Sequence, residues 1–123
     1  MSDAEQTVRD FMAAFATRDV DHIMSFFAED AVYHNMPMKP VSGTEAIRGL
    51  IHFFVDPADS IEFEVRHISS TGGTVLTERM DRFVTGNKSV DLPVMGTFEV
   101  NSGKITAWRD YFDMATWQKQ AGQ

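Results

Sequence analysis

The stretch SIEFEVRHISSTGGTVLTERMDRFV, residues 60–84, decides the fold class. Apolar residues at positions 61, 63 and 65 alternate with charged residues at 62, 64 and 66, and Gly72-Gly73 separates this run from a second alternating run. A period of two is typical of a half-buried β-strand, and paired glycines mark a turn. The stretch therefore predicts an antiparallel hairpin.

The sequence after this hairpin continues the same pattern. Gly86-Asn87 predicts a second turn, after which apolar residues at 90, 92, 94, 98 and 100 share one face of a strand. The segment 101–103 predicts a third turn, and Lys104 to Phe112 a final strand. We therefore expect a four-stranded meander, with a short closing helix capped by Asp113 and a fifth short strand at 31–35.

Helical spacing dominates the chain before residue 60. Apolar residues at 8, 11, 12 and 15 follow the i, i+3, i+4, i+7 pattern, and so do those at 20, 23, 24 and 27. Asp19 is placed to cap the second helix, and a third begins at Thr44 and stops before Pro57. Helices followed by an antiparallel sheet predict an α+β fold. We expect a curved mixed or antiparallel sheet wrapped around three N-terminal helices, a cone with an internal apolar pocket.

Composition limits the classes of function. The 123 residues predict a single domain spanning 1–123, with 43% hydrophobic residues and a conventional core. A formal net charge of -7 disfavours binding to nucleic acid or anionic membranes. The chain has no cysteine. It also has no run of about 18 apolar residues, so no membrane span is predicted. With no basic, apolar leader, a cytoplasmic location is expected.

Charged side chains on two predicted strands occupy positions where apolar ones would be expected. Arg79 and Asp81 share a face with Phe83, and Asp110 lies between Trp108 and Phe112 on the last strand. A buried carboxylate is costly unless it is paired, and an arginine on a neighbouring strand supplies the pairing. These two strands alone are compatible with an active site or with a buried structural ion network.

Tyr33 and Asn35 share a face at the end of the short predicted strand, just before Pro37. Together they can hold a water molecule, although such residues at a strand end are also common as surface or capping groups. The order Y-x-N-x-P, E-R-x-D and W-R-D-Y-F-D closely resembles the limonene epoxide hydrolase family. That family is a branch of the α+β cone superfamily that includes nuclear transport factor 2 and ketosteroid isomerase.

The resemblance implies a role for each polar residue. It makes Tyr33, Asn35 and Asp110 the holders of the nucleophilic water, Asp81 the acid, and Arg79 the bridge between the two aspartates. It also implies a small apolar epoxide and water as substrates, a vicinal diol as product, and no cofactor. The residues predicted to form the apolar walls of the pocket are Met12, Phe15, Phe83, Leu92, Val94, Trp108 and Phe112.

The chemistry fits two carboxyl groups in opposite protonation states. Opening an epoxide needs a proton for the departing oxygen and a deprotonated water at the carbon. Two carboxyls in one apolar pocket do not both ionise cheaply, so one of them should stay protonated while Arg79 keeps the other charged. In the roles that the resemblance implies, Asp110 is the base and Asp81 the acid. Direct attack on the epoxide by a carboxylate is a second route that the sequence leaves open.

Alternatives to this reading come from the same residues. An isomerase or cyclase of the same fold, and a non-enzymatic protein that binds an apolar ligand, remain rival functions. The four histidines show no metal-ligand spacing, so no metal site is expected. Leu76, Met80 and Val84 lie on the face opposite Arg79, which predicts a homodimer that covers this outer sheet face.

Overall fold

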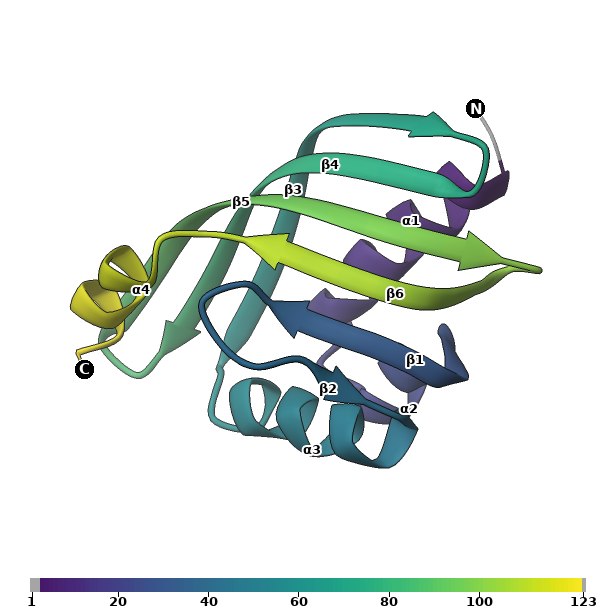
Figure 1. Cartoon of the computed structure of the whole chain (residues 1–123). Coiled ribbons are helices and arrows are strands. Elements are labelled where there is room, and N and C mark those ends of the chain that lie inside the picture. Colours follow the sequence, from purple (N-terminus) through teal and green to yellow (C-terminus); the bar gives the residue numbers. More distant parts are fainter. Residues whose placement is uncertain (1–2, 123) are drawn as a thin grey trace.

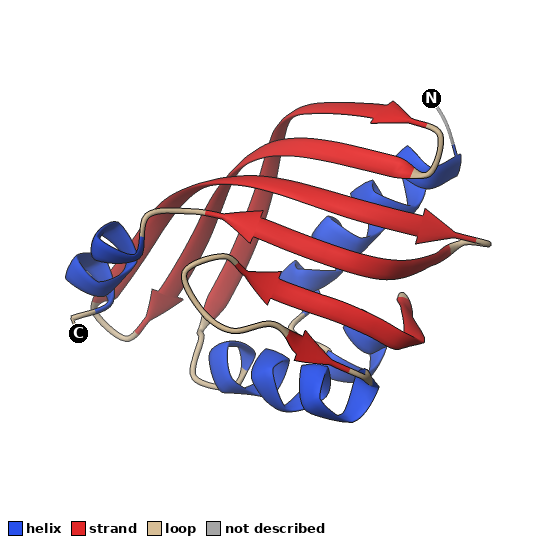
Figure 2. Ribbon diagram, viewed as in Figure 1, coloured by secondary structure: helices blue, strands red, loops and turns tan. Residues whose placement is uncertain are grey.

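The sheet that the hairpin pattern predicts is the main element of the fold. A computed structural model describes residues 3–122, so residues 1, 2 and 123 of the expected domain lie outside it. Within the described range one curved, unclosed sheet has the strand order β2-β1-β6-β5-β4-β3 (Figures 1 and 2). The strands are β1 (Phe27–Asn35), β2 (Val41–Ser42), β3 (Ser60–Thr71), β4 (Thr74–Thr85), β5 (Lys88–Asn101) and β6 (Lys104–Tyr111).

The predicted meander is confirmed, because β3, β4, β5 and β6 pair in sequence order and antiparallel. Gly72 and Gly86 adopt φ of 58° and 62° in the first two turns, a left-handed conformation that glycine adopts without steric cost. The sheet is mixed because β1 runs parallel to β6. The predicted short strand is longer than expected, and β2, with only two residues, had no detectable pattern.

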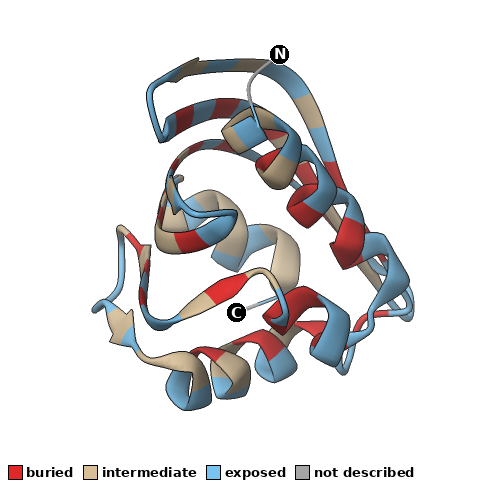
Figure 3. Ribbon diagram, turned by 90° about the vertical axis from the view of Figure 1, so that its right-hand side faces the viewer, coloured by how far each residue is buried: buried red, intermediate tan, exposed pale blue. Residues whose placement is uncertain are grey.

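Helices cover one face of this sheet. They are α1 (Asp3–Ala14), the 3-10 turn η1 (Phe15–Thr17), α2 (Val20–Met24), α3 (Thr44–Val55) and α4 (Met114–Ala121). Helix α1 packs on β3, β4 and β5, and its buried positions face the sheet (Figure 3). The predicted caps are confirmed, since Asp19 accepts from the backbone N–H of His22 and Asp113 from that of Thr116.

One predicted helix boundary is wrong. The helical spacing of 20, 23, 24 and 27 suggested that Phe27 ends the second helix, but α2 stops at Met24 and Phe27 begins β1. Phe27 is nevertheless buried, 6% exposed, because its ring packs edge-on against Phe11. A buried side chain at the start of a strand therefore satisfied the helical pattern by coincidence.

The core lies between α1, α3 and the inner face of the sheet. Phe11, Phe98 and Trp108 are fully buried at its centre, and the Phe11 ring packs edge-on against the other two. A second, smaller cluster lies between β5 and α4, built on Val90, Leu92 and Val94. Across residues 3–122, none of the helices has both the length and the apolar character to cross a membrane.

Candidate active site

Three charged side chains from β4 and β6 meet on the inner face of the sheet. Arg79 is 1% exposed, and Asp81 and Asp110 are each 4% exposed. Nε and Nη2 of Arg79 donate to Oδ1 and Oδ2 of Asp81 at 3.0 and 2.8 Å. Nη1 and Nη2 donate to Oδ1 and Oδ2 of Asp110 at 3.1 and 2.8 Å. A further bond from Nη1 to Oγ1 of Thr77, at 3.1 Å, engages the fifth N–H of the guanidinium.

Strand register explains how the arginine reaches an aspartate two strands away. Arg79 and Asp81 are two residues apart on β4 and therefore share a face. Between β4 and β6 lies Gly96 of β5, whose register partners are Thr77 on one side and Asp110 on the other. A Cβ added at Gly96 would overlap Nη1 of Arg79 and lie 2.6 Å from Oδ1 of Asp110. The guanidinium of Arg79 and the carboxylate of Asp110 therefore meet in the space that a side chain at position 96 would occupy.

Gly96 is a site residue that the motif search missed. A glycine inside an otherwise apolar strand, here V-M-G-T-F at 94–98, is the available signal. Such a glycine often marks close approach of another group to the backbone. In this protein the approaching group is the guanidinium of Arg79.

The buried cluster carries two negative charges and one positive charge when fully ionised. Burial raises the pKa of Asp81 to about 6, against the opposing effect of Arg79, and the neighbouring charge of Asp110 adds to the rise. For Arg79, burial acts to lower the pKa, but the charges of Asp110 and Asp81 outweigh it and raise the pKa above its usual value. The site therefore contains a permanent cation and a carboxyl that takes up a proton easily.

Tyr33 and Asn35 come to the aspartates because β1 runs parallel to β6. In this register Tyr33 lies opposite Trp108 and Asn35 opposite Asp110, and both β1 side chains are at least nine-tenths buried. Burial, reinforced by the charge of Asp110, raises the pKa of Tyr33 well above its usual value, so its hydroxyl keeps its proton. The predicted polar residues are thus gathered into one site.

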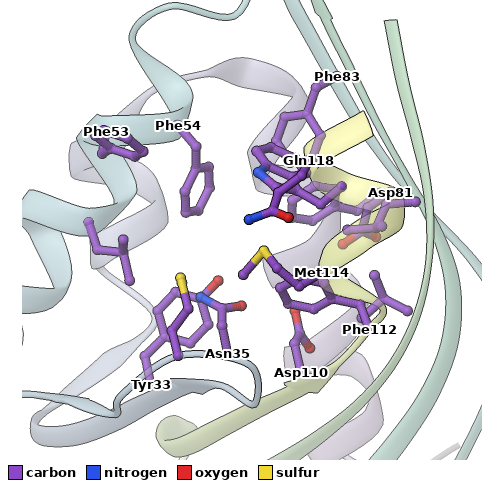
Figure 4. A pocket seen from close by; sticks show the side chains of 16 residues that line it. Tyr33, Asn35, Phe53, Phe54, Asp81, Phe83, Asp110, Phe112, Met114 and Gln118 are labelled. Atoms are coloured by element: carbon purple, nitrogen blue, oxygen red, sulfur yellow. The ribbon is translucent and has the colours of Figure 1, made fainter. Parts of the chain in front are cut away.

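A cavity of about 370 Å³ opens directly beside these groups. Tyr33, Asn35, Asp81 and Asp110 form its polar end, and Figure 4 shows their side chains pointing into it. Four predicted wall residues, Phe83, Leu92, Val94 and Phe112, line the cavity. The other lining residues are Met38, Leu50, Phe53, Phe54, Phe63, Met114, Trp117 and Gln118.

Three predicted wall residues lie elsewhere. Met12 and Phe15 are 1% and 0% exposed in the core beneath α1 and η1, and Trp108 is fully buried beside the site. None of the three lines the cavity. Periodicity identifies the buried face of a helix or strand, but it does not identify which buried side chain borders an empty space.

Helices α3 and α4 supply wall residues that were not predicted. Phe53 and Phe54 come from α3, and Met114, Trp117 and Gln118 from α4. Phe53 is 73% exposed, so it lies on the solvent-facing side of α3. The closing helix carrying Trp117 was predicted, but its packing across the end of β5 was not.

The cluster can place a charged base and a proton donor on one small molecule. No group of three potential metal ligands occurs among His, Asp and Glu residues in the range 3–122. The groups gathered at the polar end of the cavity are two carboxyls, one of them with a raised pKa, and a hydroxyl and an amide beside them.

Comparison with known proteins identifies the family of the chain. The family model of the limonene-1,2-epoxide hydrolase catalytic domain matches residues 2–122. The epoxide hydrolase EphG of Mycobacterium tuberculosis (strain ATCC 25618 / H37Rv) is 34% identical over 107 residues, which cover 87% of this chain and 71% of that protein.

Solved structures give the same result for the fold. An M. tuberculosis epoxide hydrolase described as similar to limonene epoxide hydrolases superposes with a TM-score of 0.85 at 32% identity, covering 96% of this chain and 88% of that chain. An NTF2-like protein of unknown function from Burkholderia pseudomallei K96243 reaches 0.85 at 20% identity, covering 98% of each chain. The second match supports the fold alone, whereas the family match and the curated relative identify the activity class. The chain therefore belongs to the limonene-1,2-epoxide hydrolase family, and it is an epoxide hydrolase.

Proposed function

We propose that this epoxide hydrolase adds an activated water to a small apolar epoxide in one step, without a covalent intermediate and without a cofactor. The observation that carries the proposal is the pair of buried carboxyls, Asp81 and Asp110, that share the guanidinium of Arg79 at the polar end of an apolar cavity. One carboxyl with a raised pKa beside a second one is the arrangement that acid and base catalysis at one site requires.

In this mechanism Tyr33 and Asn35 hold the water beside Asp110. As the oxygen of the water attacks an epoxide carbon, Asp110 takes a proton from that water, and the carbon–oxygen bond of the ring breaks. Asp81 gives its proton to the departing oxygen, so the product is a vicinal diol. Turnover leaves Asp110 protonated and Asp81 ionised, and Arg79 stabilises either distribution of charge until the proton returns.

The cavity limits the class of substrate. Its walls are aromatic and aliphatic apart from the polar end and Gln118, and about 370 Å³ suits a compact, apolar molecule. Phe54, Phe63 and Phe83 lie on one wall, where their apolar rings can pack against a flat or cyclic hydrocarbon. A cyclic terpene epoxide meets these conditions.

A panel of limonene oxide, cyclohexene oxide and styrene oxide tests the proposed substrate class. Incubation with the purified protein, followed by gas chromatography of the products, is expected to show a vicinal diol from at least one of the three. Heat-denatured protein measures the spontaneous hydrolysis. Failure to form diol from any member of a broad apolar panel would refute the proposed substrate class.

The pH dependence follows from the proton on Asp81. Its pKa of about 6 means that the donor form predominates below that pH and is lost above it. We expect kcat/KM to fall as pH rises through about 6, close to tenfold per pH unit once Asp81 is largely ionised. Initial rates measured between pH 4.5 and 8.5 follow this fall in kcat/KM. A value of kcat/KM that stays level from pH 6 to 8.5 would contradict a proton donor with a pKa of about 6.

We also propose that two copies pair through the outer face of the sheet. Leu76, Met95 and Tyr111 lie on neighbouring strands of this face and are 48%, 53% and 48% exposed. Pairing two such faces removes their apolar surface from water. Sedimentation or light scattering at micromolar concentration is expected to give the mass of a dimer, and Leu76→Glu to give that of a monomer. A monomeric wild-type protein would contradict this assembly.

A further inference from the structure

The indole of Trp108 is held in a single orientation by rings from the strands on either side of β6. The ring of Tyr33 from β1 stacks on it with centroids 4.0 Å apart and an interplanar angle of 6°. The ring of Phe98 from β5 stacks at 5.7 Å and 18°, and Phe11 meets the indole edge-on at 5.0 Å. With no exposed surface and neighbours on both faces, the indole cannot turn without disturbing the core.

This orientation aims the one polar atom of the indole at the proposed base. Nε1 of Trp108 donates to Oδ1 of Asp110 at 2.7 Å, which is short for an N–H donor and typical of a bond to a charged acceptor. The two residues are separated by one position on β6 and therefore share its inner face.

The two oxygens of Asp110 are consequently unequal. Oδ1 accepts from both Trp108 and Nη1 of Arg79, whereas Oδ2 accepts from Nη2 of Arg79 at 2.8 Å. Among the described residues, no other side chain donates to Oδ2 within hydrogen-bond distance. A carboxylate oxygen has two lone pairs in the carboxylate plane. Those of Oδ1 are both engaged, and Oδ2 retains one.

We infer that Trp108 is a positioning residue that occupies Oδ1 of Asp110 and leaves Oδ2 as the atom that takes the proton from water. The inference rests on the proposed function of Asp110 as the base. Two N–H donors hold the carboxylate plane against rotation, so its free lone pair keeps one direction with respect to the water.

A purely structural role for Trp108 makes different predictions. A buried indole needs a hydrogen-bond partner wherever it lies, and in that case its N–H would affect stability alone. A positioning role requires that loss of the N–H changes the catalytic step with little change in substrate binding, because Trp108 does not line the cavity.

Two variants remove the N–H. Trp108→Phe deletes the donor together with part of the ring, and incorporation of 3-benzothienylalanine at position 108 replaces N–H by sulfur while keeping the bicyclic shape. For the epoxide that wild type hydrolyses best, both are expected to lower kcat about 10- to 100-fold with KM within about twofold.

Phe11→Leu is the matched control, since it removes ring volume beside the same indole and leaves the N–H in place. Its kcat is expected to stay near that of wild type. If the benzothienyl variant also matches wild type in kcat, Trp108 is only a core residue and the inference is wrong.

A spectroscopic measurement separates this inference from the proposed function. In ¹⁵N-labelled protein the indole N–H resonance of Trp108, assigned by its absence in Trp108→Phe, is expected to move in Asp110→Asn. This readout needs no epoxide turnover. A resonance that does not move in Asp110→Asn overturns the inference even in an active enzyme. An inert protein whose resonance does move refutes the proposed function and leaves only the hydrogen bond from Trp108 to Asp110.

Discussion

Asp110→Asn and Asp81→Asn are each expected to lower kcat/KM for the preferred epoxide by about 10²- to 10⁴-fold, the usual contribution of one proton-transfer group. Asparagine keeps the shape of the side chain, but it neither accepts the proton of the water nor donates one to the departing oxygen. The comparison of kcat/KM with wild type at the pH optimum measures the effect. Near-normal activity in either variant would show that its role is assigned wrongly.

The folded state is expected to tolerate Asp81→Asn. The cluster of Arg79, Asp81 and Asp110 has one negative charge in excess, so this change leaves a neutral pair. Because the pKa of Asp81 is raised in the folded state, protonation of Asp81 favours folding. This contribution is fully present below about pH 3.8, the usual pKa of the group, and is lost as the pH rises through about 6. At pH 8 the variant should therefore be at least as stable as wild type.

Asp91→Asn is the matched control for both aspartates. Asp91 lies on β5, its side chain is 63% exposed, and its oxygen is 3.7 Å from Nε of Arg82. It should change neither activity nor the free energy of unfolding measurably. A loss of several kcal/mol in Asp81→Asn at pH 8, with Asp91→Asn unchanged, would instead favour a structural ion network.

Arg79→Met is expected to remove activity and to lower the free energy of unfolding at pH 8 by about 3–5 kcal/mol, the usual cost of leaving buried charges without their partner. The guanidinium donates to both aspartates and its side chain is fully buried, so its loss leaves two carboxyls facing each other away from water. Urea unfolding measures the change. The deficit should shrink between pH 8 and pH 5, because Asp81 takes up a proton across that range.

Arg82→Met provides the comparison on the same strand. Arg82 pairs with Glu62 and Glu64 on the outer face, where water screens the charges, and its loss is expected to cost less than about 1 kcal/mol. If Arg79→Met is no less stable than Arg82→Met, the two aspartates do not depend on Arg79 in the way that the geometry indicates.

Much of the sheet was predictable because its signals are local. Alternation from Ser60 onward and the glycine turns predict the meander, and the same parity puts Arg79 with Asp81 on the inner face. The parallel pairing that sets Asn35 opposite Asp110 joins segments some 75 residues apart, and no pattern within either segment encodes that register. The family motifs were needed to predict that these residues meet.

The parts of the site that were missed depend on packing. Trp108 was predicted to line the pocket, yet it stacks behind the site, because the Tyr33 and Phe98 rings fill the space on both of its faces. Phe53 lines the cavity although its exposure suggests a surface residue. Whether a side chain borders a void or a neighbour is decided by elements that are distant in sequence, so periodicity cannot predict it.

One measurement tests directly whether water itself attacks the epoxide. Enzyme in excess over epoxide is allowed one turnover in H₂¹⁸O, and mass spectrometry follows the label in the diol and in the peptides that contain Asp81 and Asp110. Attack by the water that Asp110 deprotonates predicts ¹⁸O in the diol from the first turnover and none in either peptide. An unlabelled first-turnover diol, together with ¹⁸O in the carboxyl group of Asp81 or Asp110, would show covalent attack by that aspartate and contradict the proposed mechanism.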